Sequence, residues 1–126
     1  MFVRREVVGG ALAALLLQGC KTMEEIDPDA PLYGLIGQMK VVPGRRDAVI
    51  GFLLAGTQAM PGNLAYLIGK DAGDADSIWI TEIWTTAAAH QASLQLPDVQ
   101  AAIAQARPFI AGFGTRVETI PVGGKH

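Results

Sequence analysis

Two proline–glycine pairs, Pro43-Gly44 and Pro61-Gly62, interrupt the middle of the chain and limit the lengths of the elements around them. Such pairs end strands and helices, because proline lacks an N–H group and glycine readily adopts turn conformations. Before the first pair, residues 32–42 (LYGLIGQMKVV) mix branched and small apolar side chains, which predicts a strand. Between the pairs, apolar side chains recur at helical spacing, which predicts an amphipathic helix over residues 45–60.

After the second pair, the pattern predicts a hairpin followed by helices and a last strand. Residues 63–70 (NLAYLIGK) and 77–84 (SIWITEIW) are rich in strand formers, and the acidic turn DAGDAD joins them. Short helices are predicted over residues 85–94 and 97–107, and a final strand over residues 113–120. The order β-α-β-β-α-β is that of the ferredoxin-like α+β fold, with helices on one face of an antiparallel sheet.

Residues 1–19 have the parts of a secretory signal peptide. Two arginines near the start lead into an uncharged run from Val7 to Leu17, which as a helix would be about 16 Å long and too short to span a bilayer. The ending LLLQGC resembles the lipobox of bacterial lipoproteins, in which the cysteine is lipidated and becomes the first residue of the mature chain. We therefore expect lipid attachment at Cys20 and residence on the periplasmic face of a bacterial membrane. The alternative is that this run is a buried helix and Cys20 a small core residue.

Removal of residues 1–19 from the 126-residue chain leaves 107 residues, which suits one domain. Residues 20–31 contain four acidic residues and two prolines and predict a tether, followed by a domain over residues 32–121 and a tail over residues 122–126. The signal also removes two of ten basic and one of twelve acidic side chains, which leaves a formal charge of −3. This charge argues against a nucleic-acid partner. Because Cys20 is the chain's one cysteine, its lipidation excludes disulfides, zinc–thiolate sites and a cysteine nucleophile.

Four stretches carry a resemblance to a known family: KVVPGRRDAVI, MPGNLAYLI, ITEIWTTAAAHQASL and ARPFIAGF. Together they resemble the antibiotic biosynthesis monooxygenases, in particular the small quinol monooxygenases, over residues 33–121. The resemblance implies a dimeric α+β barrel, in which two four-stranded sheets pack together and each protomer keeps a cavity between its sheet and its helices. The chain departs from most relatives in its lipoprotein-type signal and in the short spacing from Trp84 to His90.

The sequence contains no glycine-rich phosphate loop after a strand, no histidine pair at metal spacing and no supported Ser-His-Asp set. We therefore expect no metal site and no cofactor. Relatives of this kind oxidise hydroquinone-like or polycyclic phenols, and the substrate itself reduces O₂ after it has lost a proton. The resemblance thus implies a cofactor-independent monooxygenase whose partners are a small aromatic substrate, O₂ and a second copy of the chain.

Other functions of this fold remain open. One is a non-catalytic module that binds a hydrophobic ligand at the membrane, and another is an isomerase of a small metabolite. A haem-binding or haem-degrading protein is a third, but its relatives use a first-strand asparagine that residues 35–38 (LIGQ) lack.

Four side chains are the candidates for the site. His90 is the one histidine inside the domain and can take a phenolic proton near neutral pH, or it can merely cap or pack its helix. Trp84 can stack on an aromatic ring and donate its indole N–H, or belong to the core. Tyr66 and Asn63 can hold the substrate's oxygens, although Asn63 can equally be a turn residue.

Strand alternation adds expectations about faces. Glu82 shares a face with Trp84, and Arg116 on the last strand is its expected partner in a structural ion pair. Trp79 points to the opposite face, where we expect Val117 and Phe113 to join it in a dimer interface.

Overall fold

A computed structural model of the protein describes residues 31–125. The expected signal peptide, the expected lipidation at Cys20 and most of the expected tether lie outside the described residues. Within the described part no helix is both long and apolar enough to cross a membrane.

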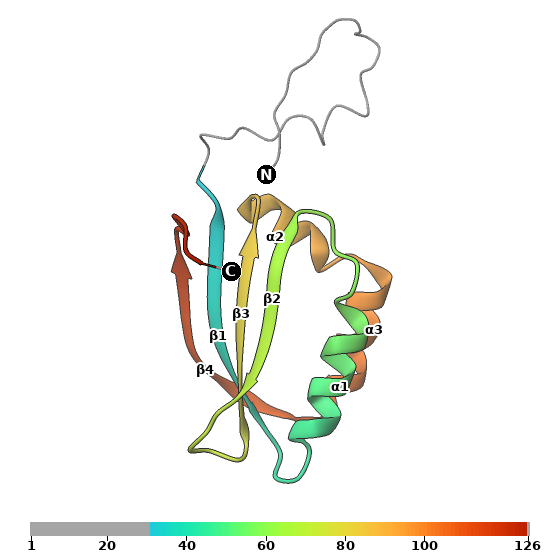
Figure 1. Cartoon of the computed structure of the whole chain (residues 1–126). Coiled ribbons are helices and arrows are strands. Elements are labelled where there is room, and N and C mark those ends of the chain that lie inside the picture. Colours follow the sequence, from blue (N-terminus) through green and yellow to red (C-terminus); the bar gives the residue numbers. More distant parts are fainter. Residues whose placement is uncertain (1–30, 126) are drawn as a thin grey trace, which may run out of the picture. The chain divides into compact units, whose positions relative to one another are not determined.

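The described residues form one antiparallel sheet with helices on one side (Figure 1). The sheet has four strands in the order β2-β3-β1-β4, so the ferredoxin-like α+β fold is confirmed. The elements in chain order are β1 (Tyr33–Val41), α1 (Arg46–Gly56), β2 (Asn63–Lys70), β3 (Ser77–Trp84), α2 (Ala87–Ser93), α3 (Pro97–Ala106), the 3₁₀ turn η3 (Arg107–Phe109) and β4 (Ile110–Thr119).

The hairpin strands β2 and β3 have the predicted bounds, and β1, α2 and α3 differ from theirs by one or two residues at an end, but α1 and β4 differ by more. The first helix stops at Gly56, four residues before the predicted end. A Cβ at Gly56 would lie 2.7 Å from the carbonyl oxygen of Asp98, so the glycine lets α1 and α3 approach closely. The last strand begins at Ile110, three residues early, because Ile110 pairs with Val41 and extends the sheet.

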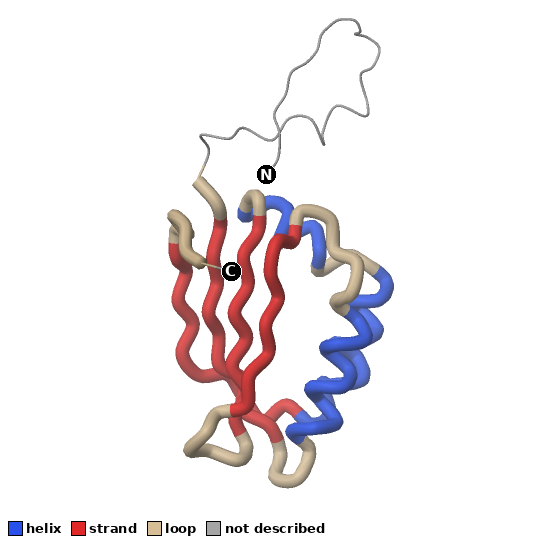
Figure 2. The backbone as a smooth tube through the Cα atoms, in the orientation of Figure 1, coloured by secondary structure: helices blue, strands red, loops and turns tan. Residues whose placement is uncertain are grey.

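The core lies between the sheet and the helices, and Figure 2 shows the helices and strands as two separate layers. At one end, Val49 and Leu53 of α1 pack against Ile78 of β3. At the other end, Trp84 packs with Met60 and Val99. Burial of these apolar side chains is the main force that holds the helices on the sheet.

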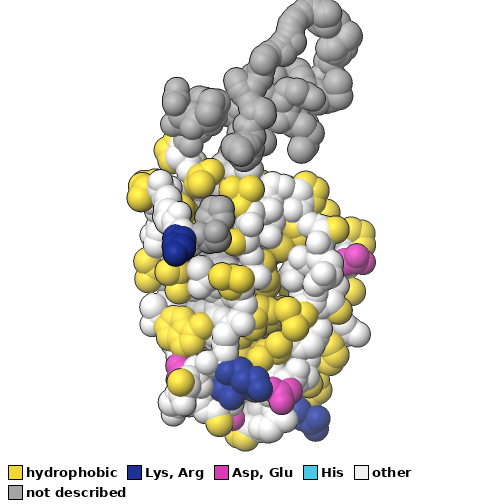
Figure 3. Space-filling view, viewed as in Figure 1, with side chains coloured by type: hydrophobic (Ala, Val, Ile, Leu, Met, Phe, Trp, Pro, Cys, Tyr) yellow, Lys and Arg dark blue, Asp and Glu magenta, His cyan; other side chains and the backbone are white. Residues whose placement is uncertain are grey.

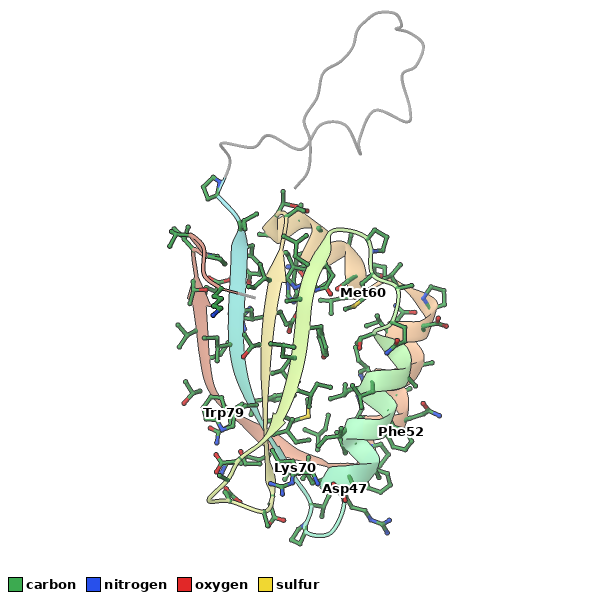
Figure 4. All side chains as sticks on the ribbon, viewed as in Figure 1. Asp47, Phe52, Met60, Lys70 and Trp79 are labelled. Carbon is green, nitrogen blue, oxygen red and sulfur yellow. The ribbon has the colours of Figure 1, made fainter. Side chains whose placement is uncertain are left out.

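Two polar contacts lie at the lower end of the domain in Figure 4. Trp79 projects from the sheet away from the helices, and its indole N–H donates to the Asp71 carboxylate at 2.7 Å. Lys70 at the end of β2 pairs with Asp47 in the first turn of α1 at 2.9 Å. Both partners of this ion pair are largely exposed, so it contributes little to stability.

The face of the sheet opposite the helices is partly apolar. Ile36 at its centre is paired with Thr81 on one side and Val117 on the other. Leu67 and Val117 remain 64% and 45% exposed. The expectation that Phe113 shares this face is wrong, because Phe113 pairs with Met39 and lines the cavity on the helix side. The physical reason is a bulge in β4, where Gly114 and Thr115 lie opposite the single residue Gln38 and so reverse the alternation of faces.

Candidate functional site

A cavity of about 370 Å³ lies between the sheet and the helices. Figure 3 shows a band of apolar side chains between the strands and the helices on the face in view. The volume falls in the range of small-molecule binding sites. Most of the lining is apolar, contributed by side chains that include Leu35, Met39, Leu53, Ile80, Val99 and Ile103.

Acid–base groups of the cavity gather around Glu82 on β3. The Glu82 Oε1 atom accepts a hydrogen bond from the Trp84 indole N–H at 2.9 Å. The His90 Nε2 atom on α2 lies 3.9 Å from the same oxygen. The Glu82 and His90 side chains are only 13% and 15% exposed. A separation of 3.9 Å is too long for a hydrogen bond, but at this burial a carboxylate attracts an imidazolium more strongly than it would in water.

Aromatic rings on two sides fix the position of the His90 imidazole. The Trp84 ring meets it edge-on, with ring centroids 5.5 Å apart. The Tyr33 ring lies against it at 5.5 Å with a tilt of 36°. At the start of α2, Thr86 accepts a hydrogen bond from the Ala89 N–H at 3.0 Å, and this cap begins the helix that carries His90. The imidazole is therefore held in the cavity by packing on both neighbouring rings.

Tyr33 is a site residue that the sequence did not indicate. Its hydroxyl donates to the Glu118 carboxylate at 2.6 Å, and the Arg116 guanidinium lies 3.8 Å from that carboxylate. Burial, reinforced by the hydrogen bond to Glu118, raises the pKa of Tyr33. Tyr33 reaches His90 because β1 pairs Tyr33 with Trp84, and no local sequence pattern reveals that register.

Tyr66 lines the cavity on β2, directly opposite Glu82 in the strand pairing. Burial raises the pKa of Tyr66 strongly, and the charge of Glu82 adds to the shift. Its hydroxyl therefore keeps its proton across the physiological pH range and can act as a hydrogen-bond donor.

The structure thus brings His90, Tyr66 and Trp84 together around one cavity but leaves Asn63 out of its lining. The Asn63 amide donates to the backbone carbonyls of Ala65 and Ile83 at 2.9 and 3.3 Å, as a turn residue would. Trp84 is fully buried and its N–H is taken by Glu82, so it orients that carboxylate.

The expected ion pair between Glu82 and Arg116 is not formed. Arg116 lies next to Glu118 on the same strand, whereas Glu82 lies next to His90. Among residues 31–125, no group of three or more His, Cys, Asp or Glu side chains is placed to hold a metal ion. What the described site offers chemically is a proton acceptor beside a buried carboxylate and a phenolic donor across an apolar cavity.

Comparison with known proteins identifies the family. Residues 32–105 match the family described as antibiotic biosynthesis monooxygenase. A solved structure assigned to that family, from Chloroflexus aurantiacus, is 52% identical, with a TM-score of 0.73 over 75% of this chain and 97% of that one. PA3566 from Pseudomonas aeruginosa is 18% identical, with a TM-score of 0.65 over 75% of this chain and 97% of that one, and shares the fold. So does a protein from Caulobacter crescentus, at 18% identity and a TM-score of 0.67 over 74% and 92% of the two chains. No curated protein matches the sequence significantly.

Replacing Tyr66 by Phe should reduce the loss of stability at alkaline pH. The folded-state pKa of Tyr66 is raised above the unfolded value of about 10, so the unfolded chain releases this proton first as the pH rises. Above about pH 10, Tyr66 should therefore lower the free energy of unfolding by up to about 1.4 kcal/mol per pH unit. Urea unfolding at a series of pH values should give a shallower decline for Tyr66→Phe than for the wild type. Equal slopes would mean that the phenol ionises as easily in the folded chain as in the unfolded one.

Proposed function

The chain belongs to the antibiotic biosynthesis monooxygenase family, and we propose that it is a cofactor-independent oxygenase of a hydroquinone-like or polycyclic phenol. The observation that carries the proposal is the placement of His90 and Glu82 at one side of a largely apolar cavity. Such a cavity favours binding of an aromatic ring. Its few polar groups can accept the phenolic proton and stabilise the charges that form in the reaction.

The reaction begins with loss of the phenolic proton. The His90 Nε2 atom accepts it, and the buried Glu82 carboxylate 3.9 Å away stabilises the imidazolium that forms. The Tyr66 hydroxyl, which its raised pKa keeps protonated, donates a hydrogen bond to the phenolate oxygen. Trp84 holds Glu82 in place through its indole N–H.

The ionised substrate then supplies the electrons that reduce O₂. A ring carbon of the phenolate forms a bond to one oxygen atom, and the O–O bond of the resulting hydroperoxide breaks. One oxygen atom stays on the ring as a carbonyl group, and the other leaves as water with two hydrogens from the substrate. The substrate is oxidised to a quinone, and the imidazolium returns its proton, so that no external reductant is consumed.

Oxygen uptake is the direct test of this proposal. The purified domain, treated with chelator and free of flavin, is given a series of quinols and naphthols in an oxygen electrode. Uptake with one oxygen atom incorporated from labelled O₂ supports the oxygenase. Binding of the same compounds without uptake would instead support a non-catalytic module for hydrophobic ligands, and isomerisation without uptake would support an isomerase.

Replacing His90 by Ala should lower turnover by about 10²-fold to 10⁴-fold, the usual contribution of a general base. Substrates that are already ionised at the assay pH should lose much less, because they need no base. The measurement is turnover against substrate pKa in the wild type and the variant. Gln91→Ala, at the neighbouring exposed position of α2, is the matched control and should keep full activity.

Two results would contradict this role. Full activity of His90→Ala is one, and the same loss for every substrate in the series is the other. Either result would mean that His90 only packs α2 against Tyr33 and Trp84.

We further propose that two copies pair through the sheet face opposite the helices, because an apolar face of this kind is rarely left open to water. Sedimentation equilibrium of the mature domain at micromolar concentration should give twice the chain mass. Leu67→Arg, on that face, should give the monomer mass. Leu67 is 64% exposed in a single copy and would be covered by pairing, so an arginine there would place a charge in the interface. Leu54→Arg, on the outer side of α1, is the control and should stay dimeric. A monomeric wild type would exclude the pairing.

For location, we propose a lipid anchor at Cys20 on the periplasmic face of a bacterial membrane, on the basis of the LLLQGC stretch. Cys20→Ala should move the protein from the membrane to the soluble periplasmic fraction and abolish labelling by a fatty-acid probe. Thr22→Ala, two residues further on, should remain in the membrane and keep the label. Membrane association of Cys20→Ala equal to that of the wild type would exclude the anchor.

A further inference from the structure

Gly37 lies in the floor of the cavity at the middle of the central strand β1. It is paired with Ile80 of β3 on one side and Arg116 of β4 on the other. Its neighbours on the same face, Leu35 and Met39, both carry side chains that line the cavity. Between them, a Cβ at position 37 would meet no atom within 4 Å. The floor is therefore open at this position.

The backbone does not require glycine here. Positive φ occurs only at other glycines among the described residues, so Gly37 has a conformation open to any residue. Close approach of a neighbour does not require it either, in contrast to Gly34, where a Cβ would clash with the Thr119 side chain, or Gly56, where it would clash with α3. A glycine inside a strand weakens the strand and often marks a place where a ligand comes close to the backbone. Empty space above Gly37 is thus the feature that the glycine provides.

The position of this space relative to His90 indicates what fills it. Glu82, which lies beside His90, is paired with Leu35, and Gly37 is two residues further along β1. Two residues of a strand extend about 7 Å. A substrate whose hydroxyl lies at His90 therefore reaches the space over Gly37 only if it continues beyond its first ring.

The volume agrees with a ligand larger than one ring. An engineered cavity of about 150 Å³ in another protein holds a single benzene molecule. The cavity here is about 370 Å³, more than twice that size. A single phenol ring beside His90 would leave much of the apolar lining without contacts, and so without the energy of burial.

We propose that Gly37 determines specificity by accommodating the second ring of a fused aromatic substrate. The proposal rests on the proposed function for the position of the hydroxyl at His90, and it narrows the substrate to phenols with at least two fused rings. A single-ring hydroquinone fits the end of the cavity beside His90 and Glu82 but does not fill the space over Gly37. Side chains at position 37 should therefore discriminate between ligands by ring number.

The test is binding of phenol, 2-naphthol and 2-hydroxyanthracene to the mature domain without oxygen, measured by titration calorimetry. The wild type should bind both fused compounds more tightly than phenol. Gly37→Val should weaken the fused compounds by about 10-fold to 200-fold, the usual effect of a steric change in an apolar pocket, and leave phenol unchanged. The affinity of Gly37→Ala for the fused compounds should lie between those of the wild type and Gly37→Val. Valine suits a strand, so the Tm of the variant should equal or exceed that of the wild type.

Gly69→Val is the matched control. Gly69 is also a strand glycine whose Cβ would meet nothing within 4 Å, but it is paired with Trp79 and is outside the cavity lining. All three affinities should be unchanged in this variant. Unchanged binding of the fused compounds to Gly37→Val, an equal loss for all three compounds, or no preference of the wild type for fused rings would each overturn the proposal.

Oxygen uptake with the same compounds separates this proposal from the proposed function. Size-dependent binding without uptake would leave the role of Gly37 standing and remove the oxygenase. Uptake that does not depend on ring number in the wild type or in Gly37→Val would leave the oxygenase standing and remove the role of Gly37.

Discussion

The pairing of β1 with both β3 and β4 is the constraint on which the site depends. A strand exposes alternate residues on opposite faces, so a shift of one residue would turn every side chain of β1 to the other side. In the observed register, Tyr33 is paired with Trp84, and Leu35 with Glu82. That register places a tyrosine against His90 and the carboxylate on the helix side of the sheet. The chemistry of the cavity is therefore a consequence of strand pairing.

Glu82 is the electrostatic centre of the cavity. A buried carboxylate is costly unless hydrogen bonds and opposite charges compensate for its lost hydration. Here the Trp84 indole N–H provides a hydrogen bond, and His90 is close enough to provide a positive charge when it is protonated. The same charge helps to keep the Tyr66 phenol protonated. In the proposed reaction, Glu82 thus stabilises the imidazolium that forms when neutral His90 accepts a proton, and the same carboxylate favours the protonated form of Tyr66.

The helices of the domain cover one face of the sheet and do not fill the space beneath them. Gly56 allows α1 and α3 to pack closely together, and Met60 and Trp84 close one end of the layer. Between these contacts, Gly37 leaves the floor open. Apolar burial holds the two layers together, while the absence of a side chain at Gly37 enlarges the cavity at that position.

The sequence by itself determined the order of elements and the bounds of the hairpin, because these follow from local patterns. The family was indicated by the resemblance of four stretches of the chain to known relatives. Strand formers on both sides of the DAGDAD turn defined β2 and β3, and Pro97 marked the start of α3. His90 was identifiable because it is the one histidine within the domain. These features depend on residue type and on neighbours along the chain.

Only the tertiary structure decided which side chains meet and which face each one occupies. Counting by twos from Val117 places Phe113 on the outer face. Between the pairs Gly37–Arg116 and Met39–Phe113, however, two residues of β4, Gly114 and Thr115, lie opposite one residue of β1, Gln38. This bulge reverses the alternation and turns Phe113 toward the cavity. Tyr33 lies 5.5 Å from His90, the Trp84 N–H is taken by Glu82, and Gly37 faces empty space. Each of these facts depends on contacts between residues far apart in the chain, which local propensity and spacing do not encode.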